Sequence, residues 1–441
     1  MKDVIRIIKA NKLPSVGIPC ERIQIGGRKG YKPNVIKFKN GELLMANFHT
    51  HCEVFDDGQM CEHTVLHRSM DNGNTWKSQH YDYLLGREPY LNVFSGDTVL
   101  ITTHLVESDV RNLTGHTDAW IHRSADKGKT WQSRIIDLDI IPEEVSMTCS
   151  SRNIIEYDDA YIMGVGCEYG KDYIFRSHDK GLSWDAEKVK VLGFDNDKYQ
   201  FSVFPEGVFH ITDTGRLLLF ARCDIRRMNF DTDIPGLPDI DAISASDCDH
   251  YDVEIIFESP DNGMTWKPVS AVPLLGCMYP SVCNLGENRY LLTYTKRTPD
   301  EKFHMGVYAI ILEENDGNIR AETESDVIVI DEKTPDYFDS GGGFGNTLKL
   351  EDGTFITPYS YLHADSDIEE LMKSGKFLEK EIFNHYRNKA YHYFKNWVGL
   401  ITWEKIIESD KVEQVHEFLG CCAVLNLCGP ITEIAKWKIS L

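Results

Sequence analysis

The chain has 441 residues, with 47 Lys and Arg against 69 Asp and Glu, so its formal net charge is −22. A negative charge of this size repels nucleic-acid phosphates and anionic membrane surfaces. Hydrophobic residues make up 42% of the chain, which also has 20 Tyr, 20 Phe and 8 Trp, enough to build large cores. We therefore expect a folded protein that binds neither nucleic acid nor membranes.

The start of the chain has no apolar stretch of signal-peptide length, and nowhere do 18 consecutive apolar residues occur. Both features predict a cytoplasmic protein. The 12 cysteines are scattered along the chain, unlike those of a small disulfide scaffold, and we expect most of them to be reduced. Cys421, Cys422 and Cys428 lie close together, but no CxxC pair accompanies them. We therefore predict no metal site and no cofactor.

Four segments share the pattern Ser-x-Asp-x-Gly-x-Thr/Ser-Trp, and each follows a short apolar run. The aspartates are Asp71, Asp126, Asp179 and Asp261, and the tryptophans are Trp76, Trp131, Trp184 and Trp266. Such a segment suits a β-hairpin turn in which Asp accepts hydrogen bonds from backbone N–H groups, Gly adopts a positive φ and Trp packs below. The four copies predict a repeat protein in which these turns are structural.

A second repeat has six copies, each an alternating strand, a tight turn and an apolar strand. The copies start at Tyr31, Arg87, Ser151, Pro205, Tyr279 and Gly343. Their spacing suits four antiparallel strands per copy. We predict one all-β domain spanning residues 1–441, a six-bladed β-propeller with blades over about residues 20–405. A strand near residues 4–8 or one near residues 433–439, in the tail 406–441, is expected to close the ring.

Two insertions interrupt the regular spacing. Residues 224–252 form an acidic loop, and residues 365–395 have the apolar periodicity of a helix. A partly apolar helix that leaves a propeller can act as a lid or hold two copies together, and the sequence leaves both roles open. A homo-oligomer formed through residues 365–395 is therefore one of two possibilities.

In an up-and-down blade the Asp turns mark one face, so the first strands start and the second strands end at the other. The cations there are Lys32, Arg87, Arg152, Arg222 and Arg297, accompanied by Asp57, Glu88, Glu206, His49, His51, His104, Tyr279 and Tyr359. In so acidic a chain this is a local reversal of charge, which favours an anionic ligand. The alternative is that each arginine simply neutralises a neighbouring carboxylate.

The Asp turns resemble the Asp-box (BNR) repeats of the sialidase superfamily, and the six copies resemble its six-bladed propellers. For sialidases the resemblance implies three arginines that clamp the substrate carboxylate, a Tyr nucleophile activated by a Glu, and an Asp acid/base. The segment from Pro205 to Arg222 resembles the strand pair that bears the activating Glu, here Glu206, and a clamp Arg, here Arg222. Arg297 corresponds to the third clamp position, and Asp56 or Asp57 to the acid/base.

Two positions depart from that pattern. Lys32 stands where a clamp Arg is expected, and Phe344 stands where the nucleophilic Tyr is expected. His49, His51 and His104 have no counterpart in the sialidase pattern, but the set is similar to that of related propellers that act on uronic-acid glycans through a His.

Our first interpretation is hydrolysis of a terminal acidic sugar of an oligosaccharide, catalysed by Glu206 and Asp57. The second is β-elimination by His49 or His104 with Tyr279 or Tyr359 as proton donor. The third is a propeller that binds sugars without catalysis. The expected substrate-binding residues are Lys32, Arg87, Arg152, Arg222, Arg297, His51 and Tyr359.

Overall fold

The regular secondary structure of the computed structural model is almost entirely β-strand. It describes residues 3–8, 13, 17–27, 30–51, 61–107, 109, 111–136, 138–145, 147–167, 170–193, 202–225, 233–238, 252–272, 274–297, 299, 303–315, 317–321, 326–334, 343, 345–362 and 430–439. A short 3-10 helix, η1, covers Leu138–Ile140. No helix within these ranges has the length and apolar character needed to cross a membrane.

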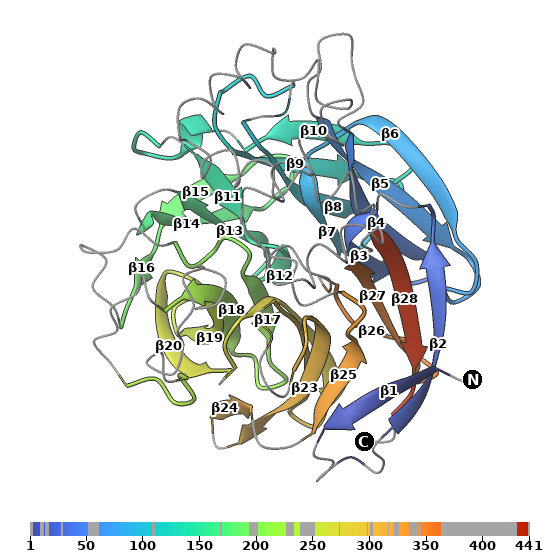
Figure 1. Cartoon of the computed structure of the whole chain (residues 1–441). Helices are drawn as coiled ribbons and strands as arrows, with labels where there is room; N and C mark the ends of the chain where they lie inside the picture. The colour runs from blue at the N-terminus through green and yellow to red at the C-terminus, as the bar shows by residue number, and fades with distance from the viewer. Residues whose placement is uncertain are drawn as a thin grey trace, which may run out of the picture.

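Four antiparallel sheets follow one another along the chain and lie around a common centre (Figure 1). The first contains β3 (Tyr31–Lys37), β4 (Leu43–His51), β5 (Cys61–Ser69) and β6 (Lys77–Leu85), and the second β7 (Arg87–Val93), β8 (Val99–Leu105), β9 (Asp118–Ser124) and β10 (Gln132–Ile135). The third contains β11 (Thr148–Ser150), β12 (Ile155–Tyr157), β13 (Ala160–Cys167), β14 (Asp172–Ser177) and β15 (Asp185–Lys188). The fourth contains β17 (Val208–Ile211), β18 (Leu217–Asp224), β19 (Asp252–Ser259) and β20 (Thr265–Ala271), with β16 (Lys190–Val191) added in parallel at its edge. Each corresponds to one of the six sequence repeats, called units below.

The fifth and sixth units share one ten-stranded sheet rather than forming two separate ones. Its strands are β21 (Cys277–Gly286), β22 (Arg289–Lys296), β23 (Gly306–Asn315), β24 (Asn318–Ala321), β25 (Val327–Asp331), β1 (Asp3–Ile8), β2 (Gly17–Ile25), β28 (Ile431–Trp437), β27 (Phe355–Tyr361) and β26 (Leu348–Lys349). The join is made by β1, which pairs with β25 along one edge and with β2 along the other. Because both edges of β1 are occupied, no gap separates the two units.

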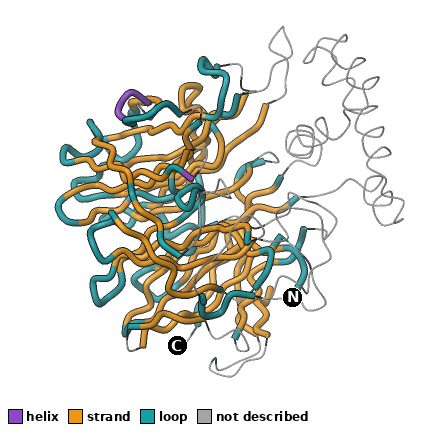
Figure 2. Tube along the Cα trace, turned by 90° about the vertical axis from the view of Figure 1, so that its left-hand side faces the viewer, coloured by secondary structure: helices purple, strands orange, loops and turns teal. Residues whose placement is uncertain are grey.

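Both ends of the chain take part in the last unit. The strand β28 lies between β27 and β2, so the C-terminal segment supplies an inner strand of the sheet and the N-terminal segment the strand beyond it. The sequence predicted closure by one end or the other, and the structure uses both. Figure 2 shows strands and connecting loops of the described chain from the side. The predicted helix over residues 365–395 lies outside the described residues.

The turn that contains Asp71 is held by its carboxylate. This group accepts hydrogen bonds from the backbone N–H groups of Asn74 (3.1 Å) and Thr75 (2.9 Å) and from the Thr75 hydroxyl (2.6 Å). The Trp76 indole N–H donates to the Gly73 carbonyl at 3.0 Å. Asp126, Asp179 and Asp261 accept equivalent backbone hydrogen bonds in their own turns. The hydrogen bonds lower the pKa of Asp71 to about 2.

These turns lie at the strand ends opposite the candidate site. In the first sheet Ser69, which opens the Asp turn, pairs with Leu43 at the start of β4. Tyr31, at the start of β3, pairs with Phe48 near the end of β4. The first strand therefore starts at the edge away from the Asp turn, which is the arrangement expected for an up-and-down unit.

Apolar cores lie between neighbouring sheets. Between the third and fourth, Phe204, Phe209 and Trp266 pack with ring centroids 5.6–5.8 Å apart. They share one buried cluster with Ile162 and Ile174 of the third sheet. Trp266 ends an Asp turn, so the repeated turn also anchors the contact between sheets.

We expect Trp266→Ala to lower the free energy of unfolding by about 3–5 kcal/mol, because it opens a cavity in a fully buried cluster. Urea unfolding measures the change. Leu113→Ala is the control, since Leu113 is 90% exposed and should change stability by less than about 0.5 kcal/mol. Equal stabilities for the two variants would show that Trp266 does not anchor the sheets.

Candidate functional site

Four residues, each at the start of the first strand of its unit, share an unusual backbone conformation. They are Lys32 (φ 47°), Glu88 (φ 58°), Glu206 (φ 61°) and Tyr279 (φ 63°). Positive φ is uncommon outside glycine and costs roughly 1 kcal/mol or more for a bulky residue. Three of the four are followed by proline, namely Pro33, Pro89 and Pro280, and the strand registers shift at these three places. The bulge in three units, and the same positive φ at Glu206 in the fourth, accompany the gathering of all four side chains in one cluster, which also contains Arg152.

Arg152 lies at the middle of this cluster, and its side chain is only 1% exposed. Its Nη2 atom lies 2.6 Å from Glu88 and 2.5 Å from Glu206. Its guanidinium carbon lies 3.9 Å from the centroid of the Tyr279 ring, a cation–π contact. Lys32 forms an ion pair with Glu88, and its Nζ lies 5.2 Å from the same ring centroid. One guanidinium thus connects residues from four units.

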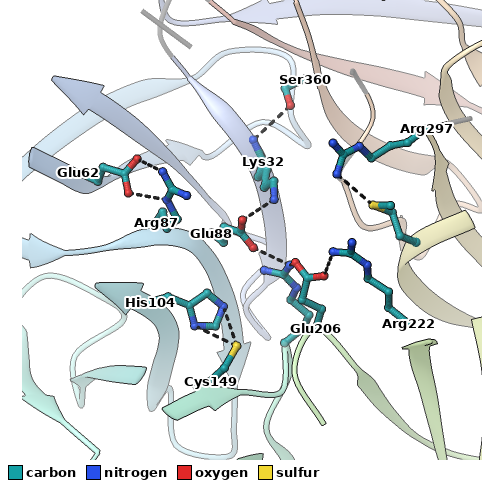
Figure 3. A network of polar contacts seen from close by, with 12 residues as sticks. Lys32, Glu62, Arg87, Glu88, His104, Cys149, Glu206, Arg222, Arg297 and Ser360 are labelled. Atoms are coloured by element: carbon teal, nitrogen blue, oxygen red, sulfur yellow. Dashed lines mark hydrogen bonds and ion pairs between the residues drawn. The ribbon is translucent and has the colours of Figure 1, made fainter. Parts of the chain in front are cut away.

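Arg222 continues the network toward the fourth sheet. Its Nη1 donates to Glu206, and its Nε donates to Asp252 at 2.7 Å. Figure 3 shows Glu206 with Arg222 on one side of it and the Lys32–Glu88 pair on the other. Three cations, Lys32, Arg152 and Arg222, are therefore matched by three carboxylates. These ion pairs have the form of the alternative that the sequence left open for the cations, in which arginines neutralise neighbouring carboxylates.

The ion pairs determine which carboxyl groups are charged. Burial alone raises the pKa of Glu206, but Arg222 and Arg152 together lower it to about 2. Burial likewise opposes ionisation of Glu88, and Lys32 with Arg152 holds its pKa well below the usual range. Both groups are ionised at neutral pH, so each can accept a proton or a hydrogen bond.

A second kind of carboxyl group, Glu254, lies beside Arg222. The two residues pair directly between β18 and β19. Glu254 is 0% exposed, and neither of its carboxyl oxygens has a hydrogen-bond partner among the described residues. Burial, and then the charge of Asp252, raises the pKa of Glu254 well above its usual value. The cluster of ionised carboxylates therefore has as its neighbour a carboxyl group whose neutral form is favoured by burial.

We expect Glu254→Gln to be more stable than the unchanged protein above pH 5. A carboxyl group whose pKa is raised in the folded state stabilises the fold only below its unfolded value near 4.5. Above that value unfolding releases a proton, so stability falls by up to about 1.4 kcal/mol per pH unit until the folded pKa is reached. Because Gln cannot ionise, the Glu254→Gln variant should not lose stability in this way as the pH rises.

Urea unfolding between pH 5 and pH 9 measures the difference between the two proteins. Glu287→Gln is the matched control, because the Glu287 side chain is 87% exposed. Parallel stability curves for Glu254→Gln and the unchanged protein would contradict the neutral state of Glu254.

His104 reaches the cluster from the second sheet. Both of its ring nitrogens lie 3.6 Å from the Cys149 sulfur. Burial lowers the pKa of His104 to about 4, although Glu88 acts in the opposite direction. The imidazole is therefore neutral at pH 7 and can accept a proton. Burial also raises the pKa of the Cys149 thiol, so this sulfur is not a thiolate.

Two further cations of the sequence prediction lie around the cluster. The Arg87 side chain forms two hydrogen bonds of 2.6 Å with Glu62, and this pair lies beside the central ion pairs in Figure 3. The Arg297 Nη1 atom lies 3.6 Å from the Met278 sulfur, and Figure 3 shows its side chain reaching inward on the same side as Arg222.

Three predicted site residues make contacts elsewhere or are described only in part. Tyr359 is buried at the seam of β2, β25 and β28, where its hydroxyl contacts Arg22, Asp331 and Glu433. His49 faces His63 and His80 within the first sheet. The backbone of His51 ends β4, but its side chain is outside the described residues. Asp57, Phe344, Cys421, Cys422 and Cys428 also lie outside the described residues.

The overall fold has counterparts among solved structures. A protein of unknown function from Dyadobacter fermentans matches with a TM-score of 0.52 and 17% identity, over 82% of this chain and 94% of that one. The intramolecular trans-sialidase from Ruminococcus gnavus, solved with oseltamivir carboxylate, matches with a TM-score of 0.50 and 13% identity, over 76% of this chain and 92% of that one. The chain has a sialidase-like β-propeller fold. No model of a protein family matches the chain, and no curated protein matches it either.

Proposed function

We propose that this sialidase-like protein is a glycoside hydrolase that cleaves a terminal acidic sugar, of the sialic or uronic acid type, from an oligosaccharide. The observation that carries the proposal is the arrangement of Lys32, Arg222 and Arg297, which come from three units and surround one centre beside the ionised Glu206 (Figure 3). Cations from separate strands form a clamp suited to a carboxylate. Lys32 contributes a point charge to this clamp, and the two arginines contribute planar donors.

Arg152 adds unused donors to the same centre. Its Nε and Nη1 atoms are buried and have no hydrogen-bond partner among the described residues. Buried donors without partners are costly, and sites that bind polar ligands are where such groups are found. In the proposal a carboxylate or hydroxyl oxygen of the sugar accepts these hydrogen bonds.

Glu206 acts as the base in this hydrolysis. With a pKa of about 2 it is ionised at neutral pH, so it takes a proton from the attacking water, and it is not the group that protonates the leaving oxygen. Asp57 has the second role, as its place in the sequence pattern implies. Phe344 has no group that can attack the sugar, so the proposed route uses water directly in place of a tyrosyl intermediate.

Elimination remains the second candidate because of one observation. A neutral imidazole and a neutral phenol both belong to the cluster: the pKa of His104 is about 4, and burial raises the pKa of Tyr279 well above its usual range. A neutral His can remove the proton beside a carboxylate while a Tyr hydroxyl protonates the leaving oxygen. His49 has no part in this version, because its ring neighbours are on the outer strands β5 and β6.

The proposal also counts the ten-stranded sheet as two blades, which gives a six-bladed ring. Strands β21 to β24 form one blade, and β26, β27, β28 and β2 form the other. The support is that each set of four follows the strand order of the separate sheets.

The test is to incubate the purified chain with oligosaccharides that end in sialic acid or in a uronic acid. Hydrolysis releases the acidic monosaccharide and a new reducing end without a new absorbance. Elimination creates a conjugated double bond that absorbs at about 235 nm. Binding without either product would contradict catalysis, and neither binding nor product with any acidic sugar would contradict the proposal as a whole.

A further inference from the structure

Three histidines on three neighbouring strands gather at one place in the first sheet, outside the central cluster. His49 on β4 and His63 on β5 are directly paired. His80 on β6 pairs with Val65. The ring centroids of His49 lie 5.8 Å from those of His63 and His80, and the latter two are 6.3 Å apart.

The regular strand ladder that runs from the Asp turn, from Arg68 with Lys77 to Val65 with His80, brings His80 to this place. His63 pairs with Leu85 and Val65 pairs with His80, so two steps along β5 correspond to five along β6. Continued without a break, this ladder would put Asp82 opposite His63 instead of Leu85. Irregularities of this kind change which side chain faces a given position. The bulge in β6 therefore puts Leu85, and not the carboxylate of Asp82, opposite His63.

One ring nitrogen from each histidine lies within 4.8 Å of the others. In tetrahedral zinc coordination, with Zn–N bonds of about 2.0–2.1 Å, the ligand nitrogens are roughly 3.4 Å apart. Small rotations of the three side chains are enough to close this difference. We propose that His49, His63 and His80 bind a divalent transition metal ion of the zinc class, for which imidazole is a preferred ligand.

The neighbouring His67 is a structural histidine of the same sheet, and its hydrogen bonding differs from that of His80. It is buried, and both of its ring nitrogens have protein partners, Ser78 Oγ at 2.8 Å and Asn47 Oδ1 at 3.2 Å. Among the described residues the exposed His80 has no hydrogen-bond partner, and its ring contacts those of His49 and His63. A metal ion can therefore enter from the side of His80.

The proposed metal site is separate from the central ion pairs. Its ligands come from the second, third and fourth strands of the first sheet, whereas Lys32 of the cluster comes from the first strand. Three protein ligands leave a fourth coordination position for water or another small ligand. Bound metal would also join β4, β5 and β6, so metal addition should raise the melting temperature.

The experiment titrates the full chain, first treated with a chelator and kept reduced, with Zn²⁺ and, in parallel, with Co²⁺, whose visible spectrum reports coordination. We expect one strong equivalent and an affinity at least about tenfold weaker in His80→Ala and His80→Gln. Both changes are at an exposed position, so the fold should persist, and circular dichroism checks it. His178→Ala, also at an exposed position, is the matched control and should bind like the unchanged chain.

Cysteine thiols that take up metal would do so equally in all of these variants. Equal Zn²⁺ affinity in the unchanged chain and both His80 variants, or no binding by the unchanged chain at millimolar Zn²⁺, would overturn the proposal.

Discussion

Glu206→Gln is expected to lower glycoside hydrolysis by roughly 10²–10⁴-fold, the usual contribution of a general base. Gln keeps the shape of the side chain, and its single amide oxygen can still accept a hydrogen bond from either Arg152 or Arg222. It loses the other contact, and it cannot take a proton from water. The measurement is the rate of release of the acidic monosaccharide at saturating substrate. Affinity for the product should change much less than the rate.

The matched control for this change is Glu258→Gln. Glu258 also pairs with an arginine, Arg216, at 2.8 Å, but at the Asp-turn end of the same sheet. Both variants lose one charge from an ion pair, so both are expected to lose some stability. Only Glu206→Gln should lose turnover. If both keep full activity and both melt earlier, Glu206 serves only to neutralise its arginines.

The elimination route predicts the opposite order of effects. His104→Ala would then abolish the absorbance near 235 nm, whereas Glu206→Gln would mainly weaken binding. Because burial holds the pKa of His104 at about 4, a reaction that uses its neutral form should lose rate only as the pH falls toward that value. A lyase activity that survives in His104→Ala would exclude this histidine as the base.

Local signals made much of the fold predictable. The Asp turns are specified within nine residues, because Asp71 and its equivalents bond to backbone groups only three or four positions away. The fusion of the last two units was not predictable in this way. It depends on the pairing of Arg6 with Val329, and nothing in either short strand identifies so distant a partner.

Part of the candidate site was also predictable, because the repeats themselves can be recognised from local sequence patterns. Repeat alignment placed Lys32, Arg152, Glu206 and Tyr279 in one cluster, because equivalent positions in different units face one centre. Glu88 was placed at the same face but given no role. The proline after Lys32, Glu88 and Tyr279 is a signal that could have grouped these three residues, since a residue without an N–H marks a break in the ladder.

Other residues could not be found from the pattern of the sequence. Glu254 is preceded by Val253 and followed by Ile255 in a buried strand, and its neutral state depends on burial that only the packed sheets create. His49 meets His63 through the register of β4 with β5, which no spacing along the chain reveals. Tyr359 was assigned to the site from its strand position, but its hydroxyl is used by Asp331 and Glu433 at the seam of the ring.

Arg222→Ala is expected to weaken binding of an acidic monosaccharide by about 2–4 kcal/mol, or roughly 30- to 1,000-fold. The change removes one of the three cations proposed to hold the sugar carboxylate. It also leaves Glu206 and Asp252 without the guanidinium that they share, so the region becomes more negative and repels the ligand further. Isothermal titration with free sialic acid and with a free uronic acid measures the effect.

Loss of stability must be separated from loss of the clamp, because breaking a buried ion pair destabilises the fold as well. Arg216→Ala provides this separation. Arg216 precedes β18, whereas Arg222 lies near its other end, and Arg216 bonds to two carboxylates, Glu258 at 2.8 Å and Glu314 at 2.9 Å. Its removal should cost comparable stability in urea without changing the affinity for the sugar.

Arg222→Lys should recover only part of the binding, because an ammonium group keeps the charge but not the planar pair of donors. Equal affinities in Arg222→Ala and Arg216→Ala would mean that Arg222 holds its own carboxylates and no sugar.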